Sequence, residues 1–61
     1  MDGLIGESAK LTIKDQISQK NLFYTAKKIT AISQTHIFFV DKFGNHLGFR
    51  LNDILQFEII N

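Results

Sequence analysis

Apolar residues recur at every second position along most of this chain, and this period constrains the fold more than any other feature. Residues 9–14 read AKLTIK, which alternates strictly. Successive side chains of a strand point to opposite faces of a sheet, so the alternation predicts a strand with one face toward the core and one face exposed to solvent. Residues 46–51 and 55–59 alternate in the same way. The residues predicted to face the core are Ala9, Leu11, Ile13, Leu47, Phe49, Leu51, Leu55, Phe57 and Ile59.

Residues 22–33, LFYTAKKITAIS, are the ambiguous segment. Phe, Tyr, Thr and Ile recur in it, as is typical of a pleated surface. The alternation holds on each side of Lys27 and Lys28 but slips by one residue between them. Such a slip indicates a β-bulge, which bends a strand sharply. We therefore predict a bent strand, although helical spacing can also be drawn through the segment and a helix is the alternative.

The segment from residue 36 to residue 51 predicts a β-hairpin. Its first strand, residues 36–41, is apolar on both faces, which fits a central strand or one whose second face meets a partner. The turn at residues 41–45 contains Gly44 and Asn45, which tolerate the positive φ that tight turns require. Residues 15–21 are polar and predict a long loop, with Ile17 tucked inward.

The composition is that of a single small domain spanning residues 1–61. A chain of 61 residues buries only about 60% of the surface that its unfolded form exposes, so its stability margin is thin. It contains no Cys, so neither a disulfide nor a thiolate metal site can stabilise the fold. Association with another molecule is the remaining source of extra stability. We expect residues 1–7 to form a loose arm, unless Leu4 and Ile5 pack over one end of the core.

The order of these elements resembles that of the SH3-like and Sm-like small β-barrels over residues 9–60. The resemblance lies in the bent strand Phe23–Ile32, in the hairpin IFFVDKFGNHLGFRL and in the terminal LNDILQFEI. It implies an all-β, five-stranded barrel with one short helical turn before the last strand. Ala26 stands where Sm-like proteins usually carry a Gly in the bent strand, and their basic-glycine signature is missing. Ring assembly and uridine binding therefore transfer to no residue here.

No motif for catalysis, metal binding or a cofactor stands out. His36 and His46 could approach each other across the hairpin turn, but two imidazoles without carboxylates make a weak site, and we predict no metal. The chain has no Gly-rich phosphate loop and no Ser-His-Asp ordering. We expect a protein that is not an enzyme, with no cofactor and no small-molecule substrate.

The sequence gives no sign of a membrane or secreted protein. No apolar run approaches the roughly 20 residues of a membrane span, and MDGLIGESAK lacks the basic start and long apolar stretch of a signal peptide. We expect a cytoplasmic protein.

The first functional hypothesis is a non-enzymatic binding module that acts by protein association, either with itself or with a larger partner, in an accessory or regulatory role. Strand 36–41 is apolar on both faces, and Ile59 and Ile60 are adjacent in the last strand, so some apolar groups must leave the core. Apolar surface and unpaired strand edges mark an interface. The predicted interface residues are Phe38, Val40, Phe57, Ile59 and Ile60.

The alternative hypothesis is a small nucleic-acid-binding barrel. Cations neutralise phosphate and aromatic rings stack on bases, so basic side chains interleaved with aromatic ones suit this ligand. The net charge of +1 is too balanced to predict nucleic acid by itself. Lysines on solvated strands also protect edges from aggregation. The residues predicted for this surface are Lys10, Lys14, Tyr24, Lys27, Lys28, Phe43 and Arg50.

Overall fold

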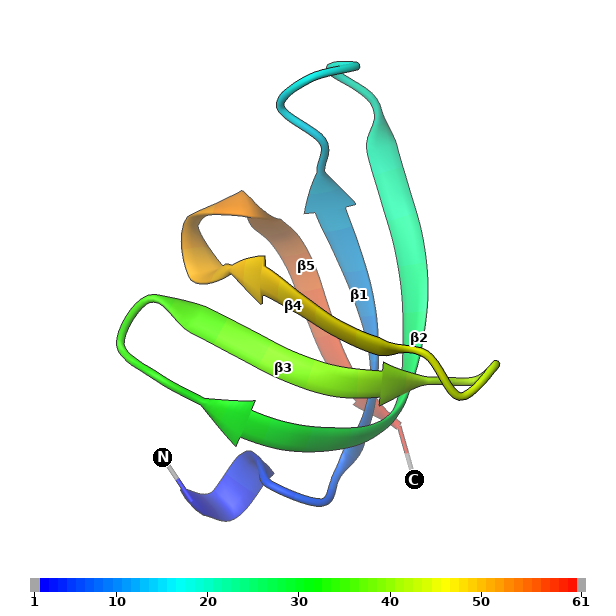
Figure 1. The fold of residues 1–61 in the computed structure, drawn as a ribbon, viewed down its shortest axis with the longest axis vertical. Helices are drawn as coiled ribbons and strands as arrows, with labels where there is room; N and C mark the ends of the chain where they lie inside the picture. The colour runs from blue at the N-terminus through cyan, green and yellow to red at the C-terminus, as the bar shows by residue number, and fades with distance from the viewer. Residues whose placement is uncertain (1, 61) are drawn as a thin grey trace.

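The computed structural model describes residues 2–60, which form a single sheet of five antiparallel strands (Figure 1). The elements are η1 (Asp2–Leu4), β1 (Ser8–Lys14), β2 (Asn21–Ile32), β3 (His36–Asp41), β4 (His46–Arg50), η2 (Leu51–Asp53) and β5 (Ile54–Ile60). The all-β prediction is confirmed, and the short helical turn before the last strand is η2. Neither helical segment of residues 2–60 is long and apolar enough to cross a membrane.

β2 is the longest strand, and it bends where the sequence predicts. It pairs with β1 through Ala26, and the pairing with β3 begins at the same residue. The register with β3 shifts between Ala26 and Lys28, so Lys27 is an extra residue of the bulged strand. A second shift follows between Ile29 and Ala31. The helix alternative for this segment is wrong, because bulges absorb the phase slip.

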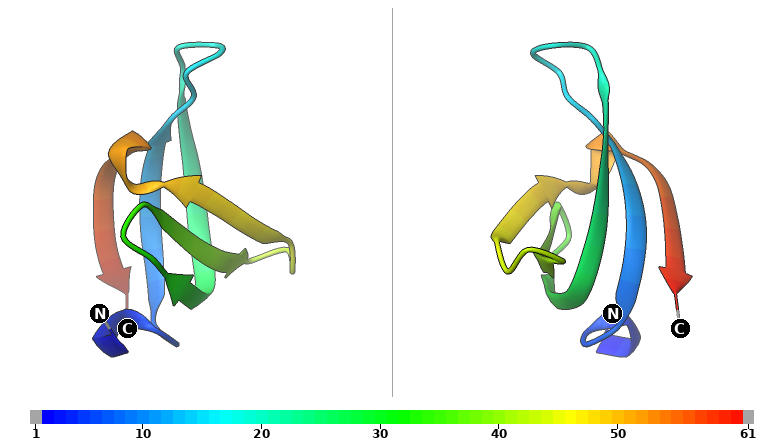
Figure 2. Two further views of the ribbon diagram at one scale, coloured as in Figure 1. Left: turned by 60° about the vertical axis from the view of Figure 1, so that its left-hand side comes forward. Right: turned by 90° about the vertical axis from the view of Figure 1, so that its right-hand side faces the viewer.

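The sheet curls but does not close. Its strand order is β4-β3-β2-β1-β5, which leaves β4 and β5 as the two edges. Figure 2 shows β3 and β4 on one side of β1 and β2, with β5 on the other side. Within residues 2–60, no ladder joins β4 to β5. The closed barrel implied by the resemblance is therefore not confirmed, and the sheet is open along one side.

The core lies on the inner face of this curled sheet. Its fully buried residues are Ala9, Leu11, Ile13, Ala26, Ile29, Ile37 and Phe39. Leu47, Phe49 and Ile59 pack against them as predicted. Leu4 also packs against the core, and the backbone of Gly6 and Glu7 is hydrogen-bonded to Ile29.

Four side chains predicted to lie inside the fold are exposed, namely those of Leu55, Leu51, Ile17 and Phe57. A register shift between Thr12 and Ile13 pairs Ile13 with Ile54, so Ile54 takes the inward position and Leu55 is 52% exposed. Leu51 falls in η2 and lies at the surface. Ile17 is 96% exposed, because Asp15 accepts hydrogen bonds from the loop backbone and turns the loop outward.

Gly48 makes room for an aromatic ring on the outer face of the sheet. It lies opposite Phe38 in the β3–β4 ladder, and a Cβ on Gly48 would stand 2.6 Å from Cδ1 of the Phe38 ring. The His36 ring stacks on the same phenylalanine, with 6.0 Å between the ring centroids. Phe38 therefore covers the backbone of an edge strand at a position where only Gly fits beneath it.

We expect Gly48→Ala to lower the free energy of unfolding by about 1–3 kcal/mol, because the new methyl group displaces the Phe38 ring. In a Phe38→Ala background the clash is gone, and the same substitution should be neutral or stabilising, since Ala loses less chain entropy than Gly on folding. Urea unfolding of the two single variants and the double variant measures this coupling. An equal cost of Gly48→Ala in both backgrounds would contradict the packing described.

Candidate interaction surfaces

The predicted interface residues lie in two separate places. Phe38 and Val40 lie on the outer face of β3, Phe38 exposed and Val40 half-buried. Phe57 and Ile59 lie on the inner face of β5, opposite buried residues of β1. Ile60 pairs with Ser8 at the end of β5. The five residues do not form one patch, and their role in an interface stays a prediction.

An apolar hollow of about 290 Å³ opens between β3 and β5, on the side where the sheet fails to close. We call it the apolar groove. Its lining residues are Leu4, Ile32, Ile37, Leu51, Ile54 and Phe57. Phe57 lies on the inner face of β5 but is 37% exposed, and among residues 2–60 the only strand paired with β5 is β1. The groove is therefore an apolar surface that the fold covers only in part.

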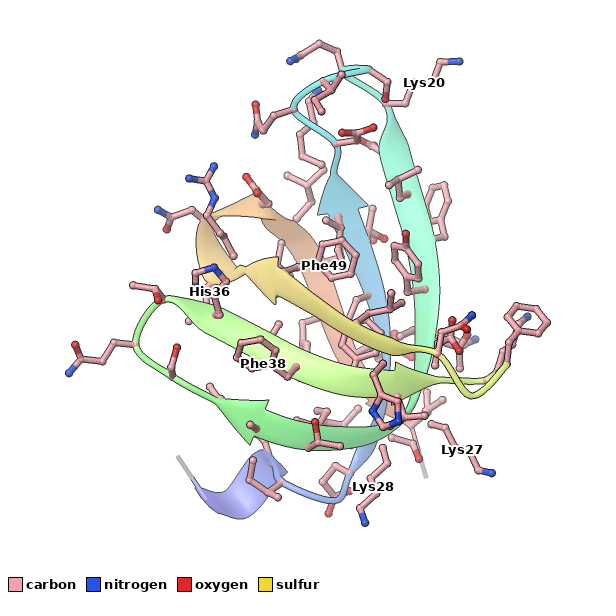
Figure 3. The ribbon with its side chains drawn as sticks, in the orientation of Figure 1. Lys20, Lys27, Lys28, His36, Phe38 and Phe49 are labelled. Atoms are coloured by element: carbon pink, nitrogen blue, oxygen red, sulfur yellow. The ribbon has the colours of Figure 1, made fainter. Side chains whose placement is uncertain are left out.

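The predicted basic residues are also divided. Lys10 and Lys14 lie on the outer face of β1. Lys27 and Lys28 project from the bend of β2, and Figure 3 shows both pointing away from the sheet. Arg50 ends β4 and forms an ion pair with Asp53, with 3.4 Å between Nε and Oδ2.

The aromatic residue exposed beside the lysines of β1 is Phe23, which the sequence analysis missed. Tyr24 is half-buried on the inner face, with its ring centroid 5.1 Å from that of Phe49 and 6.1 Å from that of Phe39. Phe23 pairs with Thr12 on the outer face and is 77% exposed. The alternation of residues 22, 24 and 26 already places Phe23 outward and was the signal that could have found it.

Phe43 lies at the tip of the β3–β4 turn and is 76% exposed. The turn is hydrogen-bonded to β2, because the backbone N–H of Lys42 donates to the carbonyl of Thr25 at 3.1 Å. Phe23 and Phe43 therefore flank one hollow of about 250 Å³. The Lys42 Nζ lies 5.3 Å from the centroid of the Phe43 ring, within the range of a cation–π contact.

The carboxylate of Asp41 holds this turn in shape. Its Oδ1 accepts hydrogen bonds from the backbone N–H of Phe43 at 2.9 Å and of Asn45 at 2.8 Å. Burial of the carboxylate acts to raise the pKa of Asp41. The hydrogen bonds from Asn45 and Phe43 outweigh that effect and hold the pKa below its ordinary value. Gly44 supplies the positive φ of +86° that closes the turn.

The two histidines do not meet. His36 pairs with Arg50 and His46 pairs with Val40, so they lie at opposite ends of the β3–β4 ladder. The His36 ring nitrogen Nδ1 is instead 2.8 Å from the hydroxyl of Thr35. Among residues 2–60, no group of three or more His, Cys, Asp or Glu side chains could hold a metal ion.

Comparison with known proteins gives no matching family model, no similar curated protein and no similar solved structure. The function is therefore inferred from the residues of this chain.

We expect acid to weaken the fold partly through Asp41. Its folded-state pKa is lowered, so its carboxylate contributes stability above the unfolded-state pKa of about 4, and this contribution is lost as the pH falls through the folded-state pKa. Asp41→Asn should therefore lower the melting temperature at pH 7, and the gap from wild type should shrink on acidification. Thermal unfolding followed by circular dichroism from neutral pH to about pH 2 measures the gap.

Glu58→Gln is the control, because it removes one negative charge from an exposed side chain of β5 without touching the turn. Its melting temperature should stay close to that of wild type at every pH. A gap between wild type and Asp41→Asn that is the same at neutral and acidic pH would argue against the proposed role of the Asp41 carboxylate.

Proposed function

We propose that the protein is a non-enzymatic binding module that acts by protein association through the open side of its sheet. The apolar groove carries this proposal, because its six lining side chains are all apolar. Burying apolar surface is favourable by about 25 cal/mol per Å². A partner that covers the groove removes this surface from water and adds stability to a small domain.

The two sheet edges favour a second copy of the chain as the partner. An edge strand presents a row of N–H and C=O groups that can pair with another strand. Each molecule carries two such edges, β4 and β5, and β5 also lines the groove. β4 ends in the cationic Arg50, whereas β5 carries the anionic Glu58. Pairing of these edges between molecules would complete the barrel that a single chain leaves open.

We expect wild-type protein to form dimers or larger assemblies that dissociate on dilution. Leu51→Asp places a charge at the rim of the groove and should weaken self-association by tenfold or more, because the carboxylate loses its water when the groove is covered. Sedimentation velocity or light scattering over a wide concentration range measures the assembly size. Circular dichroism checks that the variant is still folded.

Ile17→Asp is the matched control. Ile17 is an equally large apolar residue, but it is 96% exposed in the loop between β1 and β2, and it neither lines the groove nor lies on an edge strand. It should leave self-association close to that of wild type. A wild-type protein that stays monomeric at its highest soluble concentration would contradict the self-association proposal. Equal effects of the two substitutions on assembly size would show that the groove is not part of the interface.

A further inference from the structure

We infer that the outer face of β1 and β2, together with the β3–β4 turn, binds a single-stranded nucleic acid. We call this surface the aromatic–lysine face. It consists of Lys10, Lys14, Phe23, Lys42 and Phe43. It lies on the opposite side of the sheet from the core and its apolar groove.

The two phenylalanines have no packing role that explains their position. Phe23 is 77% exposed and Phe43 is 76% exposed, yet both flank the same hollow beside Thr25. The turn that carries Phe43 is fixed by the Asp41 carboxylate and by the hydrogen bond from Lys42 to β2. Two rings held in place around one hollow form a stacking platform, since every base has a π-face that stacks on an aromatic side chain.

Lys10 and Lys42 line the hollows that the two rings flank, and Lys14 lies farther along β1. In the ladders of β1, Lys10 lies opposite Thr25 of β2 and opposite Glu58 of β5, while Lys14 lies opposite Asn21. A larger hollow of about 660 Å³ extends from Phe23 and Lys42 across β1 to β5. Three lysines face two carboxylates, those of Glu58 and Asp41. The Asp41 carboxylate is buried and accepts hydrogen bonds from the turn backbone, so the exposed charge of this face is positive.

Charge and ring placement together select the ligand. A polyanion is attracted to the lysines, while a second copy of the same positive face is repelled. An acidic peptide would use the lysines but would leave the rings without a partner. A duplex keeps its bases stacked inside, whereas a single strand offers both phosphates and free base faces. A single strand is therefore the ligand that uses every part of the surface.

The first test titrates the full chain into a labelled single-stranded oligonucleotide of mixed sequence at low salt, with fluorescence anisotropy as the readout. Phe23→Ala and Phe43→Ala should each weaken binding about 5- to 150-fold, the effect of losing one stacked base. Ile17→Ala is the control, because Ile17 is an apolar side chain that is 96% exposed at a different loop. It should bind as wild type does.

The second test measures the salt dependence. With three phosphates neutralised, a tenfold rise in salt should weaken binding about 100-fold, and Lys10→Ala should lower the logarithmic slope by about 0.7. Lys28→Ala removes the same charge from β2 beyond the bulge, where the strand pairs with β3 and lines neither hollow, and it should leave the slope unchanged. Leu51→Asp should also bind as wild type does, which separates this face from the groove.

The inference is overturned by any of three results. The first is no binding to single-stranded RNA or DNA at low salt. The second is equal binding of the oligonucleotide by wild type and by the two Phe variants, together with displacement of the oligonucleotide by polyglutamate. This result would identify an acidic protein surface as the ligand. The third is equal affinity for a duplex of the same sequence.

Discussion

The bend of β2 is the constraint on which the rest of the structure depends. Two extra residues, one between Ala26 and Lys28 and one between Ile29 and Ala31, turn a single strand so that it pairs with β1 along its first half and with β3 along its second. Bulges increase the local twist and bend the bulged strand. They place Ala26 and Ile29 on the same inner face, where both are fully buried.

The same bend gives the molecule two surfaces of different chemistry. Because β3 and β4 curl over one side of the core and, within residues 2–60, β5 pairs only with β1, the inner face stays open along the apolar groove. The outer face of β1 and β2 instead carries lysines and the exposed ring of Phe23, with the exposed ring of Phe43 beside it on the β3–β4 turn. The apolar groove and the aromatic–lysine face therefore differ in chemistry and lie on opposite sides of one sheet.

Much of the fold was predictable because strands appear in the sequence as alternation of apolar and polar residues, and a bulge appears as a slip of that alternation by one residue. Sequence could not decide between Ile54 and Leu55 as the inward residue, since both are apolar and the deciding register shift lies in the pairing with β1. Closure of the sheet into a barrel could not be predicted from the sequence either, because it depends on whether β4 and β5 form hydrogen bonds to each other. For the candidate site, Lys10, Lys14 and Phe43 were predicted, whereas Phe23 was missed although its phase placed it outward.

Deletion of Lys27 tests the bend most directly. Lys27 is exposed and is the extra residue of the first bulge. The fold therefore does not need its side chain, but it does need a residue at this position. The account predicts that Lys27→Ala unfolds cooperatively with nearly wild-type stability. The deletion should lose the cooperative transition, because a one-residue slip turns the buried residues of half the strand to the wrong face. A deletion variant that folds as stably as Lys27→Ala would contradict the account.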